Sequence, residues 1–148
     1  MKQIEEYFPR ELLERFGASV AEAGAHAEAA VAEVIARLEA LGAERMSAAV
    51  APGKWSPLQV ADHLHRVNVL AIDGIRRVSE GEEPVRTERG HVGVDGGLVV
   101  SLAAAEPVRE PAFASVAADL RRSTAALVEA AAQAEGVGLA ATVVNVNP

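Results

Sequence analysis

The sequence predicts an all-α protein: an up-and-down helical bundle with a long crossover between its second and third helices. Half of the 148 residues are hydrophobic, but only 3% are aromatic. A core built from Ala, Val and Leu favours closely packed helices over a sheet sandwich. Three segments also repeat small or apolar residues at helical spacing, which forms one stripe along each helix. A chain of this length is expected to form one domain, residues 1–148.

The first long helix is predicted over residues 19–41. Gly42 is expected to cap its C-terminus, because glycine takes left-handed backbone angles without strain. A short separate helix is expected over residues 9–17, since Pro9 suits a first turn and Gly17 weakens continuation. The stripe of the long helix consists of Val20, Gly24, Ala27, Val31, Val34, Leu38 and Leu41.

The second helix has the clearest start in the sequence. Ser56 can cap it, Pro57 fits the first helical position, and Gln59 completes a capping box with Ser56. Trp55 directly precedes this cap, and we expect it to be substantially buried and to staple onto Val60. The predicted inner stripe of the helix consists of Val60, Leu64, Val67, Ala71 and Val78.

A crossover of residues 81–110 separates this helix from the third. It starts at Gly81, which is expected to end the second helix. Asp95 and Gly96 in its centre can turn a small hairpin, and a mobile loop is the open alternative. The third helix is predicted to begin near Pro111 and to close at Gly136. Its stripe consists of Phe113, Val116, Leu120 and Leu127.

Charge and composition argue against several classes of partner. The formal net charge of -7 opposes a phosphate-binding surface, so neither nucleic acid nor an anionic membrane is expected. The chain has no cysteine, which excludes disulfides, thiolate metal ligands and a cysteine nucleophile. The N-terminal stretch carries acids where a signal peptide needs an apolar core, and no run approaches ~20 apolar residues. We therefore expect a cytoplasmic protein.

The four histidines are the candidate metal ligands. His63 lies one position from Leu64, so its ring can point along the edge of the core, although a capped or solvated histidine is the commoner case. His65 lies roughly 200° around the helix from His63. Both rings cannot easily bind one ion, and His65 is expected to be exposed. His26 is expected at the surface, and His91 has no local partner.

The stretch "WSPLQVADHL" resembles the start of the second helix in the DinB/YfiT-like superfamily. The order of elements along the chain is similar as well. The resemblance implies a four-helix bundle with a divalent metal, zinc or nickel, held by His63 and by two histidines of the fourth helix. A metal with an open coordination position lowers the pKa of a bound thiol or water. The matching residues are Trp55, Ser56, Pro57, Val60, His63 and Leu64.

The resemblance also suggests an activity. Members of this superfamily include thiol S-transferases that use bacillithiol or mycothiol, and a maleylpyruvate isomerase, and they are often dimers. It therefore implies a metal-dependent hydrolase or thiol S-transferase with a small-molecule thiol as partner. No catalytic residue is assigned, and no cofactor besides the metal is expected.

The end of the chain departs from the family pattern. The last helix of the family carries an H-x-x-x-H pair, and this sequence has no histidine after His91. The final residues, "TVVNVNP", resemble the segment that leads into that helix, so the fourth helix is expected to be missing, through truncation or natural degeneration. A lone His63 is not expected to hold zinc, so the chain alone is expected to be inactive.

The missing helix suggests an alternative function. Three amphipathic helices without a fourth leave an apolar groove exposed, so a second copy of the chain is the expected partner. The alternative is a non-catalytic bundle that binds an apolar ligand or a partner helix as a homodimer. A homodimer can also add ligands beside His63, although the helical phases do not favour this. The candidates from the second copy are His26, His65, His91, Asp62 and Asp73.

Overall fold

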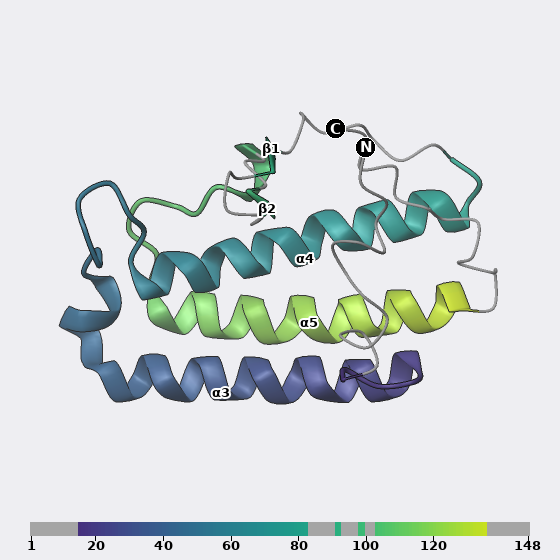
Figure 1. The fold of residues 1–148 in the computed structure, drawn as a ribbon, viewed down its shortest axis with the longest axis horizontal. Helices are drawn as coiled ribbons and strands as arrows, with labels where there is room; N and C mark the ends of the chain where they lie inside the picture. Colours follow the sequence, from purple (N-terminus) through teal and green to yellow (C-terminus); the bar gives the residue numbers. More distant parts are fainter. Residues whose placement is uncertain (1–14, 83–90, 93–97, 100–102, 136–148) are drawn as a thin grey trace.

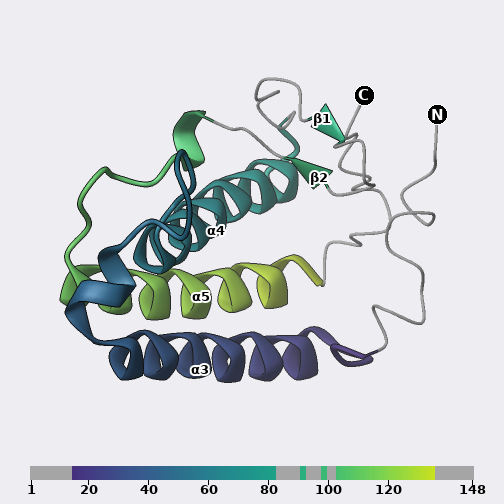
Figure 2. The ribbon, with the colours of Figure 1, turned by 60° about the vertical axis from the view of Figure 1, so that its left-hand side comes forward.

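The computed structural model describes residues 15–82, 91–92, 98–99 and 103–135. Within these residues, three long helices lie side by side, with α5 between α3 and α4 (Figures 1 and 2). α5 contacts both neighbours, and its contact with α4 is the more extensive. The predicted all-α helical class is confirmed. The three helices are α3 (Val20–Ser47), α4 (Pro57–Ser79) and α5 (Phe113–Glu135).

The crossover between α4 and α5 is described in part. Two short strands pair antiparallel, in the register that places His91 opposite Val99. This pairing agrees with the hairpin alternative, although the expected turn at Asp95 and Gly96 lies outside the described residues. A 3₁₀ turn then packs against α4 on the side away from α5 (Figure 2). These elements are β1 (His91–Val92), β2 (Leu98–Val99) and η1 (Ala103–Ala105).

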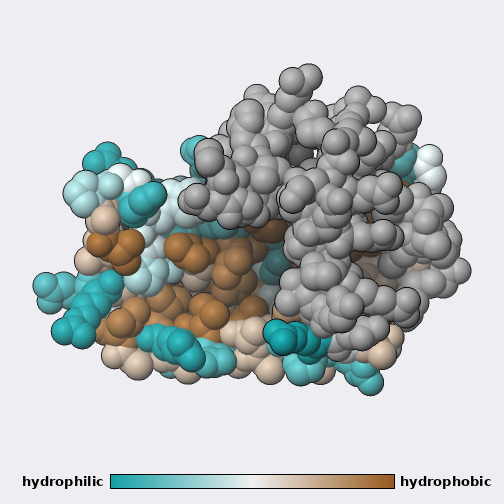
Figure 3. Space-filling model, in the orientation of Figure 1, coloured by the Kyte–Doolittle hydropathy of each residue, from teal (hydrophilic) through white to brown (hydrophobic). Residues whose placement is uncertain are grey.

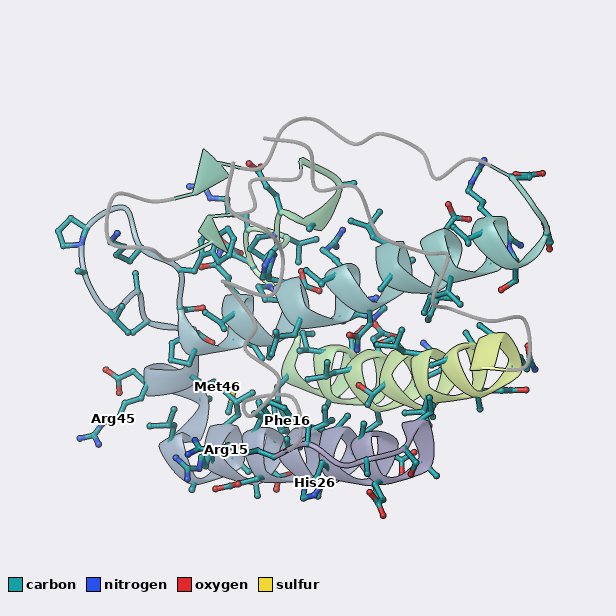
Figure 4. All side chains as sticks on the ribbon, turned by 45° about the vertical axis from the view of Figure 1, so that its right-hand side comes forward. Arg15, Phe16, His26, Arg45 and Met46 are labelled. Atoms are coloured by element: carbon teal, nitrogen blue, oxygen red, sulfur yellow. The ribbon has the colours of Figure 1, made fainter. Side chains whose placement is uncertain are left out.

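α3 begins and breaks where the sequence predicts. The side chain of Ser19 caps its N-terminus by accepting a hydrogen bond from the backbone N–H of Glu22 at 3.2 Å. Gly42 interrupts the helix with φ 74° and ψ 163°, a conformation that favours glycine. In the turn that follows, Arg45 points outward and Met46 lies nearer the bundle (Figure 4). Met46 is buried, so the residues after the break also contribute to the core.

The short helix expected over residues 9–17 lies mostly outside the described residues. Arg15 and Phe16 form a turn, and Gly17 follows with a φ of 122°. The side chain of Phe16 is exposed. Residues 15–17 are therefore not helical, and Gly17 lies against the first turn of α3, where a Cβ atom would meet Glu22.

The predicted capping box of α4 is confirmed. The Ser56 hydroxyl accepts a hydrogen bond from the backbone N–H of Gln59 at 3.2 Å, and the Gln59 side chain accepts one from the backbone N–H of Ser56 at 2.9 Å. Pro57 occupies the first turn. At the other end, Gly81 has a φ of 76° and follows the last residues of the helix, as predicted. These local signals determine both ends of α4.

The predicted inner stripe of α4 is wrong for its first four residues, whereas the fifth, Val78, is half-buried. Val60, Leu64 and Val67 are 44%, 40% and 36% exposed, and Ala71 is exposed as well. The helix instead buries Leu58 and Ala61. His65 and Asn68 lie on the same face and are half-buried. The two faces are about 100° apart. The exposed face is the more apolar one in sequence, because the face toward α5 includes His65 and Asn68, and Asn68 donates hydrogen bonds to Ser123 and Thr124 of α5. Periodicity cannot tell which of them faces α5.

The core lies at the end of the bundle where α3 breaks and α4 begins. Phe113 packs against this cluster, together with Val31 and Val34 of α3. On α5 the predicted stripe is confirmed, since Val116 and Leu120 are buried. The buried cluster consists of Leu38, Met46, Leu58, Ala61, Val116 and Leu120.

Candidate functional site

The candidate site centres on His63, in the second turn of α4. Its Nδ1 atom lies 2.6 Å from the carbonyl oxygen of Ala105 in η1. A carbonyl oxygen only accepts hydrogen bonds, so Nδ1 must carry the proton. In the neutral ring, Nε2 is then the unprotonated nitrogen. No hydrogen bond joins Nε2 to another of the described side chains or backbone groups.

The ring of Trp55 covers that of His63. The two ring centroids are 4.9 Å apart, and the ring planes are inclined by 45°. Trp55 is 40% exposed, so the prediction that it is substantially buried is wrong. Val60, its expected partner in a hydrophobic staple, is 44% exposed. The physical reason is that the side of α4 that carries Val60 has no helix against it among the described residues.

Besides the bond of His63 to Ala105, three hydrogen bonds attach the crossover to the first turns of α4. The side-chain amide of Gln59 donates to the carbonyl oxygens of Val108 and Arg109, at 3.3 and 3.2 Å. The backbone N–H of Val108 donates to the carboxylate of Asp62 at 2.8 Å. Ala105 is fully buried. The segment that carries the acceptor of His63 is therefore held by hydrogen bonds at Val108 and Arg109 and by the burial of Ala105 itself.

Asp62 is a functional candidate that sequence reasoning considered only as a ligand in a dimer. It is 6% exposed, and the same carboxylate oxygen that binds Val108 also accepts a hydrogen bond from Arg66 Nε at 2.9 Å. Asp73, the other carboxylate considered, is paired with Arg76 and Arg77. Both carboxylates are therefore bonded within their own chain. The spacing of Asp62 and Arg66, one helical turn, was the available signal.

The other histidines do not join His63 among the described residues. His65 is half-buried on the side of α4 that faces the bundle, so the prediction that it is exposed is wrong. Its Nδ1 atom is buried with no hydrogen-bond partner in the described part of the chain. His26 is exposed on α3, as predicted, on the side away from α4 (Figure 4). The side chain of His91 lies outside the described residues.

The geometry therefore brings one imidazole and a buried carboxylate network together. Across the described ranges, no group of three His, Asp or Glu side chains is close enough to hold a metal ion. His63 fits the role of a single ligand, because its nitrogen opposite the hydrogen-bonded one is unprotonated. A complete set of ligands is not present in the described part of the chain.

The sequence profile of the DinB superfamily matches residues 26–146. The chain belongs to the DinB superfamily. No curated protein and no solved structure matches it significantly. Among the described helices of this DinB protein, none has the length and apolarity needed to cross a membrane.

The exposed face of α4 is the second feature of this DinB domain. Val60, Leu64 and Val67 lie one helical turn apart along it and are at least 36% exposed. Figure 3 shows hydrophobic side chains gathered over the left-hand part of the three helices. Exposed apolar surface of this kind is typical of an interaction site.

Proposed function

We propose that this DinB protein is a metal-dependent enzyme, a hydrolase or a thiol S-transferase of the bacillithiol- or mycothiol-dependent type. In this proposal His63 is one ligand of a zinc or nickel ion, and a small-molecule thiol is a substrate. The cytoplasm is the proposed compartment. The observation that carries the proposal is the hydrogen bond from His63 Nδ1 to Ala105.

This hydrogen bond supports the ligand role for a chemical reason. Metal-bound histidines usually donate their other ring N–H to a carboxylate or a backbone carbonyl, which orients the ring and selects the tautomer. His63 has this arrangement. Because the described residues supply only this one ligand, the others must come from outside the described ranges or from a second chain.

Metal analysis of the protein, purified without a histidine tag, tests the proposal. We expect near-stoichiometric zinc or nickel in the wild type and its loss in His63→Ala. Arg45→Ala is the control, because Arg45 is exposed after the break in α3, is not a candidate ligand, and should leave the metal content unchanged. Metal-free wild-type protein, after dialysis against excess zinc or nickel, contradicts the proposal. An unchanged metal content in His63→Ala contradicts the ligand assignment.

The exposed apolar face of α4 favours a second candidate, a non-catalytic bundle that forms a homodimer or binds an apolar ligand. This function predicts no bound metal. It also predicts that Leu64→Glu, which places a charge in the centre of the exposed face, converts dimers into monomers in analytical ultracentrifugation. Val69→Glu is the matched control, because Val69 is 48% exposed on the opposite side of α4. A monomeric wild type contradicts the homodimer.

A further inference from the structure

We propose that Asp62 is a positioning residue for His63. By holding the backbone of Val108, it keeps the carbonyl of Ala105 where this group accepts the Nδ1 proton of His63, and so fixes the tautomer that leaves Nε2 unprotonated. The purpose of this arrangement rests on the proposed function, since an unprotonated Nε2 is what a metal ligand requires. The arrangement itself can be tested without metal.

Asp62 is the neighbour of His63 in the chain. It directly precedes His63 on α4, so the two side chains leave the helix about 100° apart. Each of them bonds the crossover, His63 at Ala105 and Asp62 at Val108. Only two residues lie between these attachment points, and one of them is Pro107, whose φ is restricted by its ring. A displacement at Val108 is therefore transmitted to Ala105.

The buried carboxylate of Asp62 requires hydrogen-bond donors. A buried charge is unfavourable unless it is hydrogen-bonded. Asp62 is 6% exposed, and its Oδ2 atom accepts from the Val108 N–H and from Arg66. A hydrogen bond from a backbone N–H to a carboxylate is stronger than one to a neutral acceptor. Asp62 therefore restrains the crossover more firmly than the two Gln59 bonds, which join neutral groups.

The hydrogen bond to Ala105 selects one tautomer of His63. A histidine without a specific partner exchanges its proton between the two ring nitrogens. At His63 only the Nδ1–H form makes the 2.6 Å hydrogen bond to Ala105. The neighbouring ring of Trp55 leaves less room for the imidazole to turn away. If the crossover moves, the preference for the Nδ1–H form is lost.

Long-range ¹H–¹⁵N correlation spectra of the metal-free full chain measure this tautomer directly. In mildly alkaline buffer, where free imidazoles are neutral, wild-type His63 should show the Nδ1–H pattern, with its signals assigned by comparison with His63→Ala. Asp62→Ala should shift these signals to those of a tautomer mixture. Asp62→Asn keeps an oxygen acceptor for Val108 but removes the charge, so it should shift the signals less than Asp62→Ala does.

Two further pairs of variants separate positioning from general stability. Val108→Pro removes the donated N–H but leaves the Asp62–Arg66 pair, and it should also change the His63 signals to those of a tautomer mixture. Val108→Ala keeps the N–H and should leave the Nδ1–H pattern unchanged. Because Val108 is 43% exposed in a connecting segment, both should fold even if Asp62→Ala does not. Asn68→Ala, which removes hydrogen bonds to Ser123 and Thr124 of α5, should destabilise the protein without changing the tautomer.

The results distinguish this inference from the proposed function. A wild-type His63 that is a tautomer mixture, or a Val108→Pro variant with the wild-type Nδ1–H pattern, overturns the positioning role. A fixed tautomer that Val108→Pro releases, in a protein that binds no metal, supports the positioning role and contradicts the metal enzyme.

Discussion

Trp55 lies over the ring of His63, with 4.9 Å between the ring centroids, and yet is 40% exposed to solvent. The indole ring therefore packs against an imidazole at the start of α4, and part of the side chain remains at the surface. The only tryptophan of the chain contributes to the surroundings of His63 more than to the core of the bundle.

Replacing Trp55 with Ala should lower the free energy of unfolding by about 1 kcal/mol. This is the range of an aromatic pair at a partly exposed position, and it is below the ~3 kcal/mol or more of a large core residue. Urea unfolding followed by circular dichroism measures the change. Trp55→Phe keeps an aromatic ring over His63 and should lower the free energy of unfolding by a smaller amount. A loss of about 3 kcal/mol in Trp55→Ala would show that the side chain belongs to the core.

Gly24 should not tolerate even a methyl group. A Cβ atom at this position would lie 2.6 Å from Cγ1 of Val128, where α3 and α5 meet. We expect Gly24→Ala to destabilise the protein by about 1–3 kcal/mol through overpacking. Val128→Ala in the same chain should recover part of this loss. The thermal or urea unfolding midpoint measures both.

Gly74 provides the matched control on α4. A Cβ atom there would meet nothing within 4 Å. Gly74→Ala should therefore raise the free energy of unfolding by about 0.5–1 kcal/mol, since alanine is the better helix former. Equal effects of the two substitutions would contradict the close approach of α3 and α5 at Gly24.

Asp73 should make stability depend on pH in the acid range. A hydrogen bond from Arg77 lowers the pKa of its carboxyl below the ordinary 3.8, against the opposing effect of desolvation and with a further contribution from Arg76. A group with a lowered folded-state pKa stabilises above its unfolded pKa, and this contribution is lost as the pH falls through the folded pKa. Because the group is at the surface, the effect should be small.

Urea midpoints at neutral pH and below pH 3.8 test this expectation. Asp73→Asn should be less stable than the wild type at neutral pH, and the difference should disappear in acid. Arg77→Gln should reproduce most of the effect, and adding it to Asp73→Asn should change little. A wild type and an Asp73→Asn variant that lose stability in parallel on acidification would contradict the assignment.

Local signals predicted the helix boundaries well. The capping box of Ser56 and Gln59 and the break at Gly42 depend on residues within a few positions of each other, so the sequence contains the whole interaction. The family assignment succeeded for the same reason, since its motif lies within the first turns of α4. These features need no knowledge of the rest of the fold.

The environment of each side chain on α4 was predicted less well. His65 was expected to be exposed and Val60 to be buried, but His65 is half-buried and Val60 is 44% exposed. The role of Asp62 could not be predicted, because Val108, 46 residues away in the chain, supplies its backbone partner.

The helical class, the ends of α4, the break in α3 and the membership of the DinB superfamily could all be predicted from the order of the amino acids. Which face of α4 meets α5, and which atoms lie around His63, depends on how the helices and the crossover pack. Helical periodicity and capping arise from neighbours in the chain. Burial, and the hydrogen bond from His63 to Ala105, arise from segments that meet only when the chain folds.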